Sequence, residues 1–163
     1  MSGVEVLRTE RLILRHLMDD DAPFVLEHLN ERGFIDNIGD RGVRDVDGAR
    51  GYIHRAGGSY QRNGYGLWAV EVPDVAAFIG FIGLAIPRFT ASFTPCVEVG
   101  WRLARRYWGQ GYATEGARAA VAFGFAEAGL EEIVSFTVPA NRRSLAVMER
   151  LGMTSEARED FDH

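Results

Sequence analysis

The sequence predicts one α/β domain, in which strand-like runs alternate with helices along the chain. Three observations lead to this prediction. A chain of 163 residues is long enough to bury one hydrophobic core. Apolar residues recur with strand-like alternation in some segments and with helical spacing in others. Residues 95–129 join a strand-like run, a glycine-bearing turn and a long apolar helix in that order, an arrangement suited to holding a phosphate group.

The first half of the chain predicts a strand and two helices. Residues 11–17 alternate in the manner of an edge strand. Three aspartates at 19–21 precede an apolar helix over 22–29, and acids are favoured at a helix N-terminus. Residues 31–47 are rich in glycine and aspartate and predict a loop. A second helix over 49–62 is weakened by its glycines.

The second half predicts more strands than helices. The strand-like runs lie over residues 66–72, 78–86, 96–103, 132–138 and, at the end, 153–157. Between them, the helix over 112–128 carries small residues on one face, which lets a helix pack closely on a sheet. A last helix begins at its N-cap, Asn141, and ends at Gly152.

Composition excludes several kinds of protein. Apolar residues make up 47% of the chain, no apolar run is long enough to span a bilayer, and residues 1–5 do not resemble a signal peptide. Cys96 is the only cysteine, so neither an intrachain disulfide nor a cysteine metal cluster can form. The net charge of -5 argues against nucleic acid as a partner. We therefore expect a cytoplasmic protein without membrane or nucleic-acid partners.

The segment 104–111, called the glycine turn below, carries the most specific motif. Its pattern is Arg-x-x-Gly-x-Gly, with Arg106, Gly109 and Gly111 at the defined positions. No Gly-Lys-Ser/Thr follows, so the turn is not a Walker loop. A dinucleotide fingerprint also fits poorly, because Thr114 stands where the third glycine belongs.

This motif resembles the coenzyme A pyrophosphate loop of the GNAT acetyltransferases. Residues 98–116 together are similar to the branch that includes the ribosomal-protein N-terminal acetyltransferases, and residues 141–153 provide a second similar block. The resemblance covers nearly the whole chain. It implies a mixed, mostly antiparallel sheet whose fourth and fifth strands splay apart, with helices on both faces and acetyl-CoA between the splayed strands.

The resemblance also implies which residues contact the cofactor and the acceptor. The cofactor-binding positions would be Trp101, Arg102, Leu103, Arg106, Gly109, Gln110, Gly111, Tyr112, Ala113, Thr114 and Asn141. The acceptor would be held by the loop from residue 31 to 47 and the region of Trp68. Phe34 in that loop is a candidate for lining the cleft, although packing onto the core is an equal alternative.

The chemistry requires a base, because a protonated amine has no lone pair with which to attack a thioester. Glu98 is the candidate, since apolar neighbours in its strand would raise its pKa toward neutrality. The alternative is a glutamate that faces solvent or pairs with an arginine, and the histidines are weaker candidates. Met148 stands where many relatives have an acidic tyrosine, so Ser144 is the candidate acid, with a local helix cap as the alternative. No histidine and carboxylate have metal-ligand spacing, so we expect no metal.

These observations favour a single domain over residues 1–163 that transfers acetyl from acetyl-CoA to a primary amine, either a protein N-terminus or a small molecule, in a ternary complex. The alternatives are a non-catalytic domain that binds or senses acyl-CoA, and a nucleotide-binding protein. Relatives continue into a seventh strand. Its absence here predicts either a longer natural chain or a partner, such as a second copy, that covers the open sheet edge.

Overall fold

The computed structural model describes residues 5–31 and 43–155. Within them, no helix is both long and apolar enough to cross a membrane. The elements follow in the order β1 (Glu5–Arg8), β2 (Ile13–Arg15), the short 3-10 helix η1 (Asp19–Asp21), α1 (Ala22–Leu29), α3 (Val46–Asn63), β3 (Leu67–Val72), β4 (Ala76–Ala85), β5 (Glu98–Leu103), the 3-10 helix η2 (Arg105–Tyr107), α4 (Tyr112–Ala126) and α5 (Arg142–Arg150).

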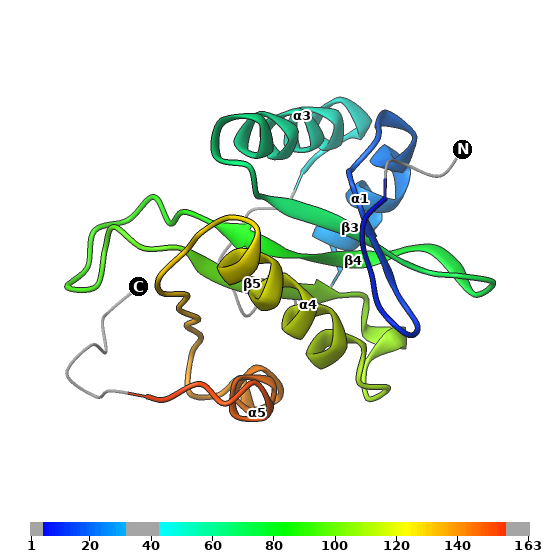
Figure 1. Cartoon of the computed structure of the whole chain (residues 1–163). Coiled ribbons are helices and arrows are strands. Elements are labelled where there is room, and N and C mark those ends of the chain that lie inside the picture. Colours follow the sequence, from blue (N-terminus) through cyan, green and yellow to red (C-terminus); the bar gives the residue numbers. More distant parts are fainter. Residues whose placement is uncertain (1–4, 32–42, 156–163) are drawn as a thin grey trace.

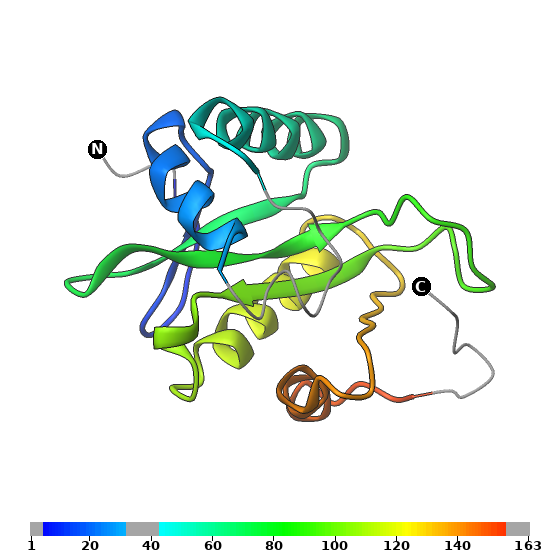
Figure 2. The ribbon, with the colours of Figure 1, turned by 180° about the vertical axis from the view of Figure 1, so that it is seen from behind.

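Five strands form one sheet in the order β1-β2-β3-β4-β5, and each pairs antiparallel with its neighbour. Helices cover both faces: α1 and α3 lie on one face, and α4 crosses the other (Figures 1 and 2). The predicted α/β fold, with helices on both faces of a mostly antiparallel sheet, is therefore confirmed.

Successive side chains of each strand point to opposite faces of the sheet, and each face carries its own hydrophobic core. Trp68, Val70 and Leu84 belong to the core beneath α4, whereas Ala69 and Phe81 belong to the core beneath α1 and α3. Small residues bring α4 close to the sheet. A Cβ atom at Gly116 would lie 2.3 Å from Cδ1 of Ile82, so any larger residue would force the buried side chain of Ile82 to shift.

Among the described residues, the strand expected over 132–138 does not form, and one strand was missed. Residues 132–138 form only a single parallel bridge, between Glu98 and Val134. Beyond it the hydroxyl of Ser135 donates to the carbonyl of Val99 at 3.1 Å, and this side-chain bond does not extend the backbone ladder. Residues 153–155 form no strand, and 156–157 lie outside the described residues. The missed strand is β1, which precedes the first expected run and pairs with β2. Residues 5–8 form a strand because they pair with β2, and not because of a strong local propensity.

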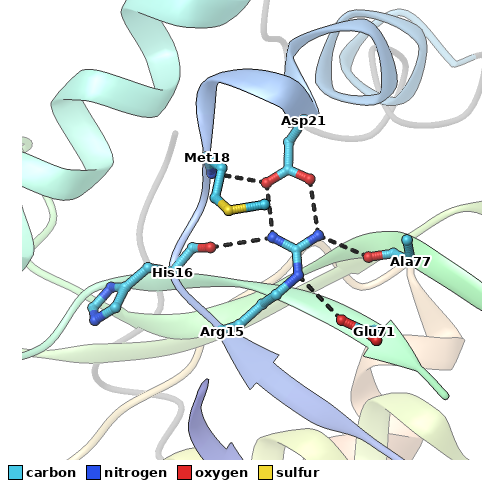
Figure 3. A network of polar contacts seen from close by, with 6 residues as sticks. All are labelled: Arg15, His16, Met18, Asp21, Glu71 and Ala77. Carbon is cyan, nitrogen blue, oxygen red and sulfur yellow. Dashed lines mark hydrogen bonds and ion pairs between the residues drawn. The ribbon is translucent and has the colours of Figure 1, made fainter. Parts of the chain in front are cut away.

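A buried ion pair fixes the start of α1 against the sheet (Figure 3). The guanidinium of Arg15 is 2% exposed and donates to both carboxylate oxygens of Asp21, each at 2.8 Å. It also donates to the carbonyl of Ala77 at 2.8 Å and to Glu71 at 3.3 Å. Asp21 accepts a further bond from the backbone N–H of Met18. The network ties β2, β3 and β4 to the helix that follows.

Asp21→Asn is expected to lower the free energy of unfolding by about 3 kcal/mol, because it removes the bidentate partner of a buried guanidinium and leaves Arg15 with the longer ion pair to Glu71, at 3.3 Å. Urea denaturation measures the change. Asp20→Asn is the matched control, since Asp20 is an exposed neighbour and its loss should change stability by less than about 0.5 kcal/mol. Equal stabilities of the two variants would show that the pair contributes little.

Candidate active site

A cavity of about 700 Å³ lies where the N-terminus of α4 meets β5, the glycine turn and α5. Its volume is within the range of small-molecule sites. The sequence-predicted residues that line it are Trp101, Arg102, Leu103, Gly109, Gly111, Tyr112, Ala113, Thr114, Asn141 and Ser144. Residues from two separate sequence blocks thus face one space.

The glycine turn presents backbone N–H groups to this cavity. Gly109 and Gly111 have φ angles of 77° and 84°, a left-handed conformation that favours glycine. Gly111 is the N-cap of α4, so the amides of residues 112–114 have no acceptor within the helix. The indole Nε1 of Trp108 donates to the carbonyl of Leu103 at 2.7 Å and holds the turn against β5. The result is a preformed anion site at the positive end of a helix.

Arg11, which lies near the N-terminus of the chain, stabilises the glycine turn through contacts with residues 110–115. Its Nε donates to Oε2 of Glu115 at 2.7 Å, and its Nη1 donates to the carbonyl of Gln110 at 2.8 Å. Its guanidinium lies 4.7 Å from the ring centroid of Tyr112. Glu115 also accepts from the hydroxyl of Thr9 at 2.6 Å, and these donors lower its pKa despite the opposing effect of burial. Sequence reasoning missed Arg11, because no local signal links residues so far apart.

The cavity is locally basic although the chain is acidic overall. Three glutamates line it, Glu10, Glu31 and Glu115. The arginines that line it are Arg11, Arg102, Arg118, Arg143 and Arg150. This excess of positive charge favours a polyanionic ligand.

Thr114 points to a specific ligand contact. The residue is 9% exposed and lines the cavity. Its Oγ1 is buried and has no hydrogen-bond partner among the described residues. A buried hydroxyl without a partner is costly, and a phosphate oxygen at the first turn of α4 would accept its proton. The site therefore fits the pyrophosphate group that the sequence motif predicts.

The outer edge of β5 opens beyond its bridge to residue 134. The N–H of Val99 donates to the carbonyl of Val134 at 2.9 Å, away from β4. Backbone N–H directions alternate along a strand, so the N–H of Trp101 points to the same edge. No residue of the 132–138 segment bridges β5 at Trp101. This edge therefore offers a fixed backbone donor beside the cavity.

Glu98 lies on the opposite face of β5 from Val99 and does not line the cavity. Its cross-strand neighbour is Ala85. Burial raises the pKa of Glu98 to about 6, with the positive charge of Arg102 opposing the shift. A carboxyl group with this pKa is largely ionised at pH 7 and still basic enough to accept a proton.

Asn141 and Ser144 stand at the start of α5, and both line the cavity. The Oδ1 of Asn141 accepts from the backbone N–H of Ser144 at 3.3 Å and caps the helix. The predicted N-cap position of Asn141 is thus confirmed. Because Asn141 is the cap, the hydroxyl of Ser144 is not needed for that purpose.

His28 also lines the cavity, close to β5. It is 5% exposed, and burial lowers its pKa to about 4, so it is uncharged at neutral pH. Its ring packs 5.3 Å from that of Phe81, between centroids. The adjacent Glu31 accepts from the backbone N–H of Arg105 at 3.0 Å and joins the end of α1 to the glycine turn. No local pattern distinguishes His28 from the other histidines of the chain.

Some sequence-predicted site residues lie elsewhere. Arg106 faces outward, with Nη1 3.7 Å from Oε1 of Glu27, and Gln110 contributes only its carbonyl to Arg11. Trp68 is fully buried beneath α4, where its ring centroid is 5.2 Å from that of Phe123, so no substrate can reach it. Phe34 lies outside the described residues.

Comparisons with known proteins agree with this geometry. A family model described as "Acetyltransferase (GNAT) domain" matches residues 11–154. "Uncharacterized protein YkkB" of Bacillus subtilis is 30% identical over 158 residues, covering 94% of this chain and 87% of that protein. "FsC-acetyl coenzyme A-N(2)-transacetylase" of Aspergillus fumigatus is 40% identical over 95 residues, covering 56% of this chain and 40% of that protein. The crystal structure of an acetyltransferase from Agrobacterium tumefaciens has a TM-score of 0.76 at 31% identity, covering 93% of this chain and 85% of that one.

The fold and the family match define an acyltransferase that uses acetyl-CoA. Because the family model matches most of the chain, the chain belongs to the GNAT acetyltransferase family.

Proposed function

We propose that this acetyltransferase transfers the acetyl group of acetyl-CoA to a primary amine by direct attack in a ternary complex. The observation that carries the proposal is the cavity that begins at the unpaired amides of α4 and reaches the open edge of β5. One end of this cavity suits a pyrophosphate group, and the other presents a backbone donor where a thioester would lie.

The residues that would hold acetyl-CoA follow from this geometry. The amides of residues 112–114 and the hydroxyl of Thr114 would bind pyrophosphate, and the arginines of the cavity would balance its charge. Residues 101–103 would pair with the pantetheine arm along the open edge of β5, with Asn141 on the facing side. Acetyl-CoA supplies an acetyl group already activated as a thioester.

The chain's own groups would then act in a defined order. Glu98 accepts a proton from the amine through a water molecule, because its side chain does not reach the cavity. The free amine forms a C–N bond with the acetyl carbon, and the carbonyl oxygen gains negative charge beside the N–H of Trp101. The C–S bond breaks, and the nitrogen of the new amide gives up its second proton to water. The departing thiolate takes a proton from Ser144, which regains one from that water.

The acceptor amine belongs either to a protein N-terminus or to a small molecule. The two sequence blocks that resemble ribosomal-protein N-terminal acetyltransferases support the first. The similarity to "FsC-acetyl coenzyme A-N(2)-transacetylase", which spans 56% of this chain and 40% of that protein, supports acetyl transfer to a nitrogen atom in either case. A cytoplasmic location and a homodimer remain predictions from the sequence.

Release of free thiol from acetyl-CoA, followed with a chromogenic thiol reagent against a panel of peptides, aminoglycosides and polyamines, tests the proposal. At least one amine should accelerate release above the hydrolytic background. Acetyl-CoA should also raise the melting temperature. Stabilisation by acetyl-CoA without amine-dependent thiol release from any panel member would instead indicate a domain that binds or senses acyl-CoA.

Ser144→Ala is expected to lower kcat by about 100-fold, because the hydroxyl is proposed to protonate the departing thiolate. The free energy of unfolding should change by less than about 0.5 kcal/mol, because Asn141 caps the helix. Ser144→Thr is the control, since it keeps the hydroxyl and should keep most of the rate. An unchanged kcat in Ser144→Ala would mean that the thiolate leaves without this residue.

A further inference from the structure

A second cavity of about 550 Å³ lies on the other face of the sheet, between α3 and the end of β4. The residues that line it are Leu29, Val43, Tyr52, Arg55, Ala56, Ser59, Arg62, Asn63, Leu67, Leu84, Ala85, Ile86 and Arg88. Its lining combines apolar residues such as Leu29 and Ile86 with polar ones, and its charged groups among the described residues are all arginines. We call it the arginine pocket.

The three arginines of this pocket have no partner within the described part of the chain. Arg55 and Arg62 lie on α3, Arg88 follows β4, and all three are exposed. No aspartate or glutamate among the described residues lines the pocket. The guanidinium groups of Arg55 and Arg62 lie back along α3, over glycines one turn earlier. Nη1 of Arg55 is 3.3 Å from the position that a Cβ would take at Gly51, and Nη1 of Arg62 is 3.2 Å from that position at Gly58. Three cations around a partly apolar lining suit a ligand that carries an anion on an apolar stem.

The arginine pocket adjoins the proposed base. Ala85 lines the pocket and is the cross-strand neighbour of Glu98. Neighbouring strands are about 4.8 Å apart, and directly opposed side chains share a face. The pocket therefore begins about one strand spacing from Glu98, on the face that carries the Glu98 side chain. The cofactor and a molecule bound in the arginine pocket would therefore reach β5 from different sides.

We propose that the arginine pocket binds an anionic group, a carboxylate or a phosphate, on the acceptor molecule whose amine is acetylated. This inference rests on the proposed function, because it takes Glu98 as the base that receives the amine proton. An acceptor with both groups would place its amine toward Glu98 and its anion among the arginines. The acidic net charge of the whole chain does not oppose this, since a local cluster determines the potential within its own pocket.

Paired acceptors that differ only in this anion test the inference. Thiol release is measured with C-terminally amidated alanyl-glutamate and alanyl-glutamine, with amidated alanyl-lysine as the oppositely charged member. Amines active in the broader panel are compared in the same way, as a carboxylate and its carboxamide. The carboxylate member should have a kcat/KM about tenfold higher than its amide. The preference should weaken as NaCl is raised, because salt screens exposed charges.

The variant Arg55→Gln/Arg62→Gln/Arg88→Gln should lose this preference, with an unchanged affinity for acetyl-CoA and unchanged rates with the amides. Arg50→Gln is the matched control, because Arg50 is an exposed arginine of the same helix that pairs with Asp47 and does not line the pocket. Melting curves of both variants verify that they are folded.

Equal rates with acids and amides, a preference for alanyl-lysine, or a preference for acids that survives in the triple variant would each overturn the inference while leaving the proposed function in place. The absence of thiol release with every amine, in protein that binds acetyl-CoA, would overturn both. Loss of the preference in the triple variant alone supports the pocket as the anion subsite.

Discussion

Gly111→Asp is expected to weaken acetyl-CoA binding by about 100-fold, equivalent to about 2.7 kcal/mol. The substitution places a negative charge at the amides that would receive pyrophosphate. It also places a side chain on a residue with a φ angle of 84°, which costs about 1 kcal/mol or more for most residues. The new Cβ would lie 3.2 Å from Nη2 of Arg11, so the new carboxylate would also draw Arg11 away from Gln110. Titration calorimetry with acetyl-CoA measures the loss.

The variant Gly64→Asp separates the effect of backbone strain from the effect of a new charge at the site. Gly64 has a φ angle of 77°, ends α3, and has nothing within 4 Å of an added Cβ. An aspartate at position 64 therefore imposes similar backbone strain, but away from the glycine turn. Gly64→Asp should lose stability and keep its affinity for acetyl-CoA. An unchanged affinity in Gly111→Asp would show that the pyrophosphate binds somewhere other than the start of α4.

Glu98→Gln is expected to reduce kcat about 100-fold at pH 7, the usual contribution of a general base, without changing the affinity for acetyl-CoA. The wild-type rate should fall as pH drops below about 6, because protonation of Glu98 removes the base. The variant should lack this decline. Rates across pH, measured by thiol release, distinguish a base from a residue that only positions the amine.

The same substitution should stabilise the protein at neutral pH. Burial raises the pKa of Glu98 from 4.5 to about 6 in the folded state, so the folded protein binds this proton more tightly than the unfolded chain. Stability therefore falls as pH rises from about 4.5 to about 6, and above that range the full penalty remains. Gln at this position avoids it, and the free energy of unfolding at pH 7 should rise by about 1–2 kcal/mol.

Glu132→Gln serves as the control for both effects, because Glu132 is an exposed glutamate in the segment that bridges to β5. It should change neither rate nor stability. A full rate in Glu98→Gln would identify a water chain or another group as the base. A loss of stability in that variant would mean that the carboxylate of Glu98 is stabilised rather than penalised in the fold.

Sequence reasoning worked best where structure depends on neighbours in the chain. Gly109, Gly111 and α4 were predicted because a left-handed turn and a helix N-terminus need only local residues. It failed for Trp68, because a strand presents alternate residues to two faces and the sequence does not say which face is the cleft. It also failed for 132–138, where β-rich composition predicted a strand but only the bridge at Val134 forms.

The sequence by itself determined the α/β class, the family resemblance and the left-handed glycine turn that precedes α4, since each depends on periodicity or on a short motif. Only the tertiary structure decided which distant groups complete the site. Arg11 reaches Glu115 across 104 positions, and the arginine pocket assembles from α3 and the end of β4. Such pairings depend on how helices pack on the sheet, and no local hydrogen bond or propensity encodes them.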